Sequence, residues 1–80
     1  MALTPAQCRA GRALVKLTQA DLANAAQVAT KTIADFELEV RTPYPRTLAA
    51  LRQALEAAGV EFIPENGGGA GVRLRKGAPA

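Results

Sequence analysis

The sequence predicts a small, mainly α-helical domain that ends in a β-hairpin. Its 80 residues include 49% apolar side chains, and this length is near the lower limit for one core without disulfides or metals. The first sixty residues are rich in Ala and carry apolar side chains at helical spacing. After residue 59 two short β-type runs flank a turn rich in glycine, a pattern typical of a hairpin.

The first helix is expected to begin after Thr4. This residue can cap the helix, Pro5 suits the first helical position, and Gln7 completes a capping box. The helix should end near Lys16. Its inward face is expected to consist of Cys8, Leu14, Val15 and Leu17.

Two short helices are expected to follow, almost end to end. Thr18 caps the first of them, with Asp21 in a capping-box variant that the helix dipole favours. The second should run from about residue 30 to residue 38. Helices of about seven or eight residues are marginal alone, so the flanking helices must cover their apolar sides. The residues expected on those sides are Leu22, Ala23, Ala26, Ile33 and Phe36.

A loop punctuated by Pro43 and Pro45 should lead into a fourth helix at about residues 46–58. Gly59 is well placed to stop this helix in a left-handed conformation. The apolar residues that recur at helical spacing in it are Leu48, Leu51, Ala54 and Leu55.

Residues 60–76 are expected to contain the hairpin, with strands at residues 60–63 and 71–75, and residues 77–80 are expected to fray. Phe62 and Ile63 should point to opposite faces of their strand. A hairpin alone is marginal in water. Its second face and open edge predict a homodimer through this element. The alternative is a hairpin that folds back on the fourth helix of its own chain, with any dimer formed elsewhere.

Composition argues against several classes of function. The chain has no His and one Cys, which excludes a His general base, a His/Cys zinc site and an internal disulfide. The glycines at residues 67–69 lack the Lys-Ser/Thr pair and the following helix of a phosphate loop. We therefore expect no catalytic, metal or cofactor site, and no enzyme. Cys8 is interpreted as a small core residue rather than a redox sensor.

Localisation and partner class follow from the same composition. The lone thiol fits a reducing cytoplasm, and neither a signal peptide nor a membrane-spanning apolar run is visible. The net charge of +3, with a pI of about 9.6, fits a polyanionic partner. No pocket for a small-molecule effector is expected in so small a core.

A longer pattern extends across the two short helices and the loop after them. It consists of Gln19-Ala20-Asp21-Leu22-Ala23, Val28, Thr32-Ile33, Phe36-Glu37 and Pro43. In this combination it resembles the XRE family of helix-turn-helix regulators, to which the phage λ repressor belongs. The resemblance covers about residues 5–58. It implies a λ-repressor-like four-helix DNA-binding domain at residues 1–59, with the helix-turn-helix motif at about residues 19–38.

The resemblance also implies a role for individual residues. In the family, the third helix enters the major groove of double-stranded DNA and its first exposed positions contact base edges. Here these positions correspond to Thr30, Lys31 and Asp35, with Thr32 available to phosphate or base. An acidic group near phosphates is unfavourable unless it accepts from a cytosine amine, so a solvated role for Asp35 is the alternative.

The remaining implied contacts lie outside the third helix. Gln19 is implied to lie on the DNA backbone and to buttress the third helix. The implied phosphate contacts are Arg41 and Arg46. An implied structural ion pair joins Arg12 to Glu37.

The chain departs from the family at four places. Lys16, Gln27 and Glu39 stand where the family usually has Gly. A non-Gly residue in the left-handed region costs roughly 1 kcal/mol, so these turns are either strained or of different geometry. Ala29 replaces the usual capping Ser of the third helix, and a shift of the helix start with Thr30 as the cap is the alternative.

The resulting functional prediction is a transcriptional regulator, a repressor that binds a palindromic operator as a homodimer. The alternative is an antitoxin-like or adaptor module that uses the same helices to hold a protein. In the hairpin, basic residues either contact DNA or prevent the exposed strand edge from pairing with other chains. They are Arg73, Arg75 and Lys76.

Overall fold

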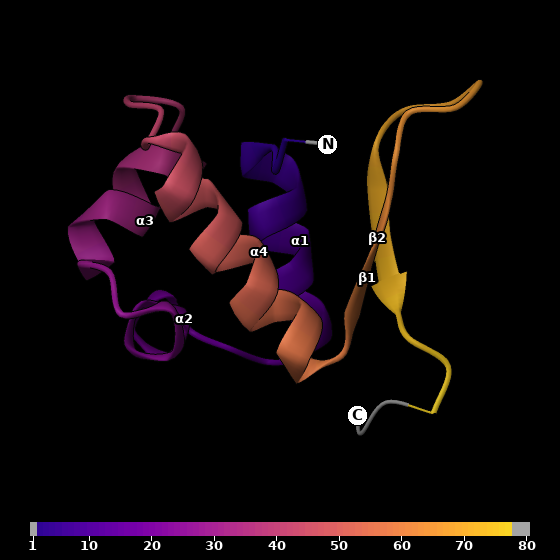
Figure 1. Cartoon of the computed structure of the whole chain (residues 1–80), viewed down its shortest axis with the longest axis horizontal. Coiled ribbons are helices and arrows are strands. Elements are labelled where there is room, and N and C mark those ends of the chain that lie inside the picture. Colours follow the sequence, from indigo (N-terminus) through magenta and orange to yellow (C-terminus); the bar gives the residue numbers. More distant parts are fainter. Residues whose placement is uncertain (1, 78–80) are drawn as a thin grey trace.

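Four helices and a two-stranded antiparallel hairpin make up the part of the chain that the structure, a computed structural model, describes, residues 2–77 (Figure 1). The predicted mainly helical class with a terminal hairpin is confirmed. Residues 78–80 of the predicted frayed tail lie outside the described residues. The elements are α1 (Pro5–Leu14), α2 (Gln19–Ala26), α3 (Thr30–Glu37), α4 (Pro45–Ala58), β1 (Val60–Ile63) and β2 (Gly71–Leu74).

The first two helices begin with capping boxes. Thr4 Oγ1 accepts from Gln7 N at 3.0 Å, and Gln7 Oε1 accepts from Thr4 N at 3.0 Å. Thr18 and Asp21 make the same reciprocal pair at 2.9 and 3.0 Å. The hydrogen bond from the Thr18 backbone lowers the pKa of Asp21. Both helix starts therefore follow from local sequence alone.

The other two helices begin without a side-chain cap, at Ala29 and Tyr44. The alternative in which Thr30 caps α3 is wrong. Thr32 N donates to Ala29 O at 3.0 Å, which places Thr30 inside the first turn. The backbone, and not a side chain, therefore determines where α3 begins.

Three helices end in the same left-handed turn. Lys16, Gln27 and Glu39 have φ values of 59°, 57° and 62°. After each, the next amide donates to a carbonyl five residues earlier, as in a Schellman motif: Leu17 N to Arg12 O, Val28 N to Ala23 O, and Val40 N to Asp35 O, at 2.9–3.0 Å. The turns thus keep a geometry that favours Gly and accept the strain of a side chain.

The core lies between the helices and the hairpin. Leu22, Ile33 and Leu51 from three helices are fully buried, together with Leu55. Gly11 of α1 faces this core, and a Cβ at this position would be in contact with Leu55 Cδ1 at 3.4 Å. Leu3, Cys8, Ala23, Phe36, Val60 and Phe62 complete the buried apolar cluster.

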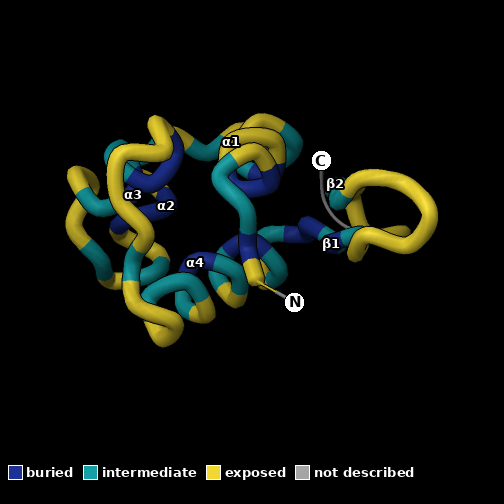
Figure 2. Tube along the Cα trace, turned by 90° about the horizontal axis from the view of Figure 1, so that it is seen from above, coloured by how far each residue is buried: buried dark blue, intermediate teal, exposed yellow. Residues whose placement is uncertain are grey.

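The hairpin folds back on its own chain, with β1 against α4 and β2 against α1 (Figures 1 and 2). Val60 and Phe62 point inward and are buried, whereas Glu61 and Ile63 are only half-buried. Phe62 and Ile63 thus lie on opposite faces, as predicted. Strand β2 ends at Leu74, one residue earlier than expected, although Arg75 N still donates to Gly59 O at 2.7 Å.

Two further contacts seat the hairpin on the helices. Gln7 Nε2 of α1 donates to Gly71 O at 3.1 Å. The Arg52 guanidinium of α4 lies 5.2 Å from the ring centroid of Phe62, within cation–π range. Gly59 ends α4 with a φ of 116°, the left-handed stop that the sequence predicted. Within residues 2–77, none of the helices has the length and apolar character needed to span a bilayer.

The left-handed turns yield a test of strain. Gln27→Gly should raise the free energy of unfolding by about 0.5–1 kcal/mol, because glycine adopts positive φ without a Cβ penalty. The same change at the exposed Gln53, inside α4, should lower it by about 1 kcal/mol. Urea denaturation of both variants measures the difference. Destabilisation by both substitutions would mean that the Gln27 turn is not strained.

Candidate functional site

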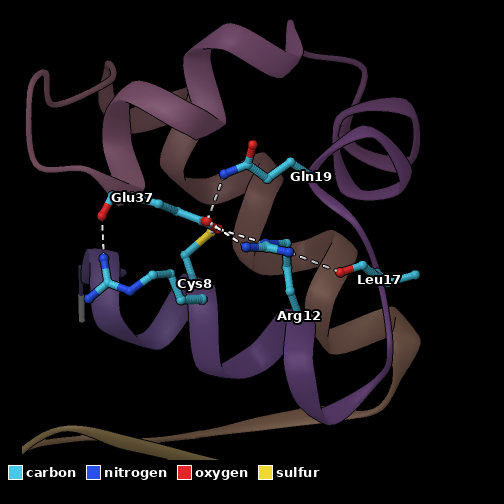
Figure 3. Close-up of polar contacts among 6 residues, drawn as sticks. Cys8, Arg12, Leu17, Gln19 and Glu37 are labelled. Carbon is cyan, nitrogen blue, oxygen red and sulfur yellow. Dashed lines mark hydrogen bonds and ion pairs between the residues drawn. The ribbon is translucent and has the colours of Figure 1, made fainter.

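The Glu37 carboxylate, at the end of α3, connects α3 to α1 and α2. Its side chain is 3% exposed. Arg12 of α1 donates to it from Nε at 2.8 Å and from Nη2 at 2.7 Å, and so forms the ion pair that the resemblance implied. Cys8 Sγ donates to Oε2 at 3.0 Å, and Gln19 Nε2 of α2 donates to Oε1 at 3.1 Å. Figure 3 shows these side chains converging on the carboxylate.

Two further arginine contacts secure the surrounding backbone. Arg9 Nη1 donates to the backbone oxygen of Glu37, at the carboxyl end of α3. Arg12 Nη1 donates to Leu17 O at 3.1 Å, in the segment that leads to α2 (Figure 3). All buried side-chain nitrogen and oxygen atoms among residues 2–77 have a hydrogen-bond partner. The polar cluster is therefore internally satisfied, as a buried charge requires.

The protonation states follow from these contacts. Burial acts to raise the pKa of Glu37, but the hydrogen bonds from Arg12, Cys8 and Gln19 outweigh it and hold the pKa below its usual range. Burial, reinforced by the hydrogen bond to Glu37, raises the pKa of Cys8 strongly. At neutral pH Glu37 is thus a carboxylate and Cys8 a protonated donor. Cys8 has its predicted place in the core, with a polar contact that apolar patterning did not indicate.

The cluster fixes the orientation of α3. Ile33 and Phe36 face the core, and Glu37 is held at the carboxyl end. An eight-residue helix is too short to be stable alone, so these contacts decide which side it exposes. The exposed positions at its amino end are Thr30 and Lys31.

The outer side of α3 carries a second ion pair, of a different kind. Lys31 Nζ lies 3.1 Å from Asp35 Oδ2 and 3.4 Å from Oδ1, one helical turn apart. The Lys31 side chain is 83% exposed, whereas that of Asp35 is only 21% exposed. Lys31 therefore covers a carboxylate that lies deeper in the surface. Exposed pairs at this spacing contribute only about 0.3–0.5 kcal/mol.

Asp35 also positions the loop between α3 and α4. Its backbone oxygen accepts from Val40 N at 2.9 Å and from Arg41 N at 3.4 Å. These bonds hold Arg41 beside the outer side of α3. A depression of about 200 Å³ results, lined by Ala29, Lys31, Thr32, Asp35, Arg41 and Pro43.

A second depression continues from the first. Thr32, Arg41 and Pro43 line both of them. The second also includes Thr42, Tyr44 and Thr47, and so extends from the loop to the first turn of α4. Arg46, in that first turn, is exposed. A continuous surface that carries Lys, Asp, Arg and Thr side chains thus extends from the outer side of α3 to the start of α4. We call it the polar surface after these side chains, although most of its exposed area is apolar.

In the described part of the chain, some cationic side chains have a hydrogen-bond or ion-pair partner within the chain and others do not. Arg12, Arg52 and Arg73 bind carboxylates, and Arg9 and Arg75 donate to backbone carbonyls. Among residues 2–77, four cations make no such contact within the chain. They are Lys16, Arg41, Arg46 and Lys76. Arg41 lies on the polar surface and Arg46 lies beside it, so these two cations are available to a partner.

The predicted site residues fall into three groups. The structure brings Lys31, Thr32, Asp35 and Arg41 together in one depression, with Thr30 exposed beside Lys31. Arg46 is exposed in α4 but does not line either depression. Gln19 is half-buried and directs its amide to Glu37.

Sequence reasoning missed residues in both parts of the site. Cys8 and Arg9 were not expected near Glu37, although Arg9 lies one turn before Arg12 on the same helix. Thr42, Tyr44 and Thr47 were also missed. A Tyr between two prolines in a predicted loop was the available signal, because loop aromatics are often exposed to partners. Tyr44 is 76% exposed, and Leu38 and Val40 nearby are 73% and 71% exposed.

No protein-family model matches the chain, and no curated protein matches its sequence. Within residues 2–77, no group of three His, Cys, Asp or Glu side chains is arranged to hold a metal ion.

Removal of the Glu37 carboxylate tests the importance of the buried cluster. Glu37→Ala should lower the free energy of unfolding by about 3 kcal/mol or more, because it leaves the largely buried Arg12 guanidinium, whose side chain is 20% exposed, without its anion. The matched control is Glu61→Ala, which breaks the exposed Arg73–Glu61 pair and should cost less than about 1 kcal/mol. Urea denaturation measures both. A loss below about 0.5 kcal/mol for Glu37→Ala would mean that the stability of the fold does not depend on the Arg12–Glu37 pair.

Proposed function

We propose that the protein is a sequence-specific DNA-binding transcriptional regulator with a λ-repressor-like domain of the XRE helix-turn-helix type. The observation that carries this proposal is the polar surface along α3. There, an internally clamped short helix exposes Thr30 and Lys31, and Arg41 and Arg46 in the following segment have no internal partner. The mild net positive charge of +3 supports a polyanionic partner.

The geometry suits a helix in the major groove. A groove about 12 Å wide admits one α-helix. In the proposed complex α2 lies across the DNA backbone and α3 enters the groove, with Thr30, Lys31 and Asp35 against base edges. Thr32 is available to a phosphate or a base. Arg41 and Arg46 contact phosphates at the rim and set the register. Gln19 holds Glu37 and so supports α3 from behind.

The proposed regulator acts as a repressor that binds a palindromic operator as a homodimer in the cytoplasm. Two recognition helices must then lie roughly 34 Å apart, one turn of DNA. The hairpin is the proposed dimer element, since β1 and β2 are paired only with each other among the described residues. Pairing with a second copy would satisfy an open edge and cover Ile63.

A protein-interaction module is the second candidate, and one observation favours it. Leu38, Val40 and Tyr44 are each more than 70% exposed close to the polar surface, and exposed apolar groups of this kind are found at protein interfaces. Salt separates the candidates, because a DNA binder with several phosphate contacts loses orders of magnitude of affinity between low and moderate salt.

Two substitutions test the proposed roles on DNA. Duplexes selected from a random pool by the wild-type protein should share a symmetric motif. Lys31→Ala should weaken binding to that motif by about 1–3 kcal/mol and relax one position in each half-site. Arg46→Ala should weaken binding to all duplexes alike. It should also reduce the slope of the logarithm of affinity against the logarithm of salt concentration by about 1, the loss of one phosphate contact. Titration of labelled duplexes at several salt concentrations measures both effects.

The outcome of this experiment separates three interpretations. If no duplex is enriched by the wild-type protein, the DNA-binding proposal is wrong. If Lys31→Ala lowers affinity and leaves the sequence preference unchanged, Lys31 is a phosphate contact only. An unchanged salt dependence of Arg46→Ala would remove Arg46 from the interface.

The dimer is tested on the outer face of the hairpin. Val60 and Phe62 belong to the core, so the hairpin must stay in place. Ile63→Asp should give a folded monomer with much weaker operator binding, because it places a charge on the proposed contact face. The control Asn66→Asp adds the same charge to the exposed turn and should remain dimeric. Light scattering at micromolar concentration decides, and a dimeric Ile63→Asp would exclude this face.

A further inference from the structure

The Lys31–Asp35 ion pair places a cationic donor beside an anionic acceptor, and the major-groove edge of a base pair likewise places an acceptor beside a donor. Its nitrogen and oxygen atoms lie 3.1–3.4 Å apart. The exocyclic donor and acceptor of a base pair, which face the major groove, are held at the ordinary N–H···O distance of about 2.9 Å. An ammonium can lie on the acceptor while the carboxylate beside it lies on the donor. The free hydrogen of the donor and the free lone pair of the acceptor point away from each other, so the ion pair must open when both contacts form, and opening an exposed pair costs little.

The groups next to that donor and acceptor distinguish the base pairs. In G·C, the guanine O6 acceptor stands beside a second acceptor, N7, and the cytosine N4 donor stands beside a carbon. In A·T, the thymine O4 acceptor stands beside a methyl group, and the adenine N6 donor stands beside the N7 acceptor. A cation therefore has two acceptors on guanine, whereas on thymine it has one acceptor beside a methyl group. A carboxylate is repelled by N7 on adenine and meets no acceptor beside cytosine N4.

The surroundings of Asp35 strengthen this preference. The Asp35 side chain is 21% exposed, and Lys31 and Arg41 line the depression with it. The backbone oxygen of Asp35 accepts from the amides of Val40 and Arg41, which keeps the Arg41 backbone beside α3. A ligand that enters must offer acceptors to the cations and a donor to Asp35. Phosphate offers only acceptors, so Asp35 disfavours a depression filled by the DNA backbone.

We propose that Lys31 and Asp35 together read one G·C pair in each half-site, with Lys31 on guanine O6 and N7 and Asp35 on the N4 amine of cytosine. This inference rests on the proposed DNA-binding function and assigns the base pair that this part of the site selects. Asp35 has a second effect. Its negative charge weakens binding to unrelated DNA, and so it sharpens specificity at the expense of total affinity.

The experiment uses the full chain and two series of duplexes. The first carries the motif selected by the wild-type protein, with its G·C pair intact or with a cytosine analogue that lacks the 4-amino group. The second is a scrambled duplex of equal length. The variants are Asp35→Ala and the matched control Glu65→Ala, which removes the same charge from the exposed hairpin turn. Thermal melting verifies that both variants are folded.

The expected pattern is a thermodynamic cycle with strong coupling. Loss of the amine should weaken wild-type binding by about tenfold, within the range of about 5- to 150-fold for base discrimination. The same analogue should lower the affinity of Asp35→Ala by less than about twofold. It should lower the affinity of Glu65→Ala as much as that of the wild-type protein. On the scrambled duplex Asp35→Ala should bind about fivefold more tightly than the wild-type protein.

Each contrary result is decisive. An analogue penalty that persists in Asp35→Ala overturns the contact between Asp35 and cytosine. A selected motif without a G·C pair at a position sensitive to Asp35 overturns the inference and leaves the proposed DNA-binding function standing. Failure of the wild-type protein to enrich any duplex overturns both.

Discussion

The buried Glu37 carboxylate is the constraint on which the arrangement of α1, α2 and α3 depends. An ionised carboxylate with a 3% exposed side chain requires a nearby cation and further donors. Arg12, Cys8 and Gln19 supply them from two other helices. A buried pair contributes little net stability compared with apolar packing, but its loss leaves an unpaired charge. We infer that it serves mainly to exclude alternative placements of α1, α2 and α3.

Local signals made most of the fold predictable. Capping boxes at Thr4 and Thr18 and the left-handed Gly59 depend on residues within one turn, and each is found at its predicted position. The contacts of Cys8 with Glu37 and of Gln7 with Gly71 join residues 29 and 64 positions apart. Periodicity marks such residues as inward-facing and does not identify their partners. The packing of the hairpin on α1 as well as α4 was missed for the same reason.

The candidate site was only partly predictable, for a related reason. The spacing of Lys31 and Asp35 permits a helical ion pair, which was therefore available from the sequence. Their union with Arg41 was not, because it depends on the left-handed Glu39 and on two amides that donate to the Asp35 backbone. Tyr44 and Thr47 join the same surface through that turn. A loop of this kind combines distant residue types whose arrangement no single periodicity encodes.

The two ion pairs of α3 differ in burial, and burial decides what each can do. Charges near a protein surface interact weakly, and the interaction strengthens as water is removed. Glu37 is enclosed by three side-chain donors, so exchange of its partners would require the helices to separate. Lys31 is largely in water, so its ammonium can take an additional acceptor at little cost. One helix thus carries a fixed carboxylate on its inner side and an adaptable pair on its outer side. A recognition surface needs both, because a contact can select among ligands only when the element that presents it does not move.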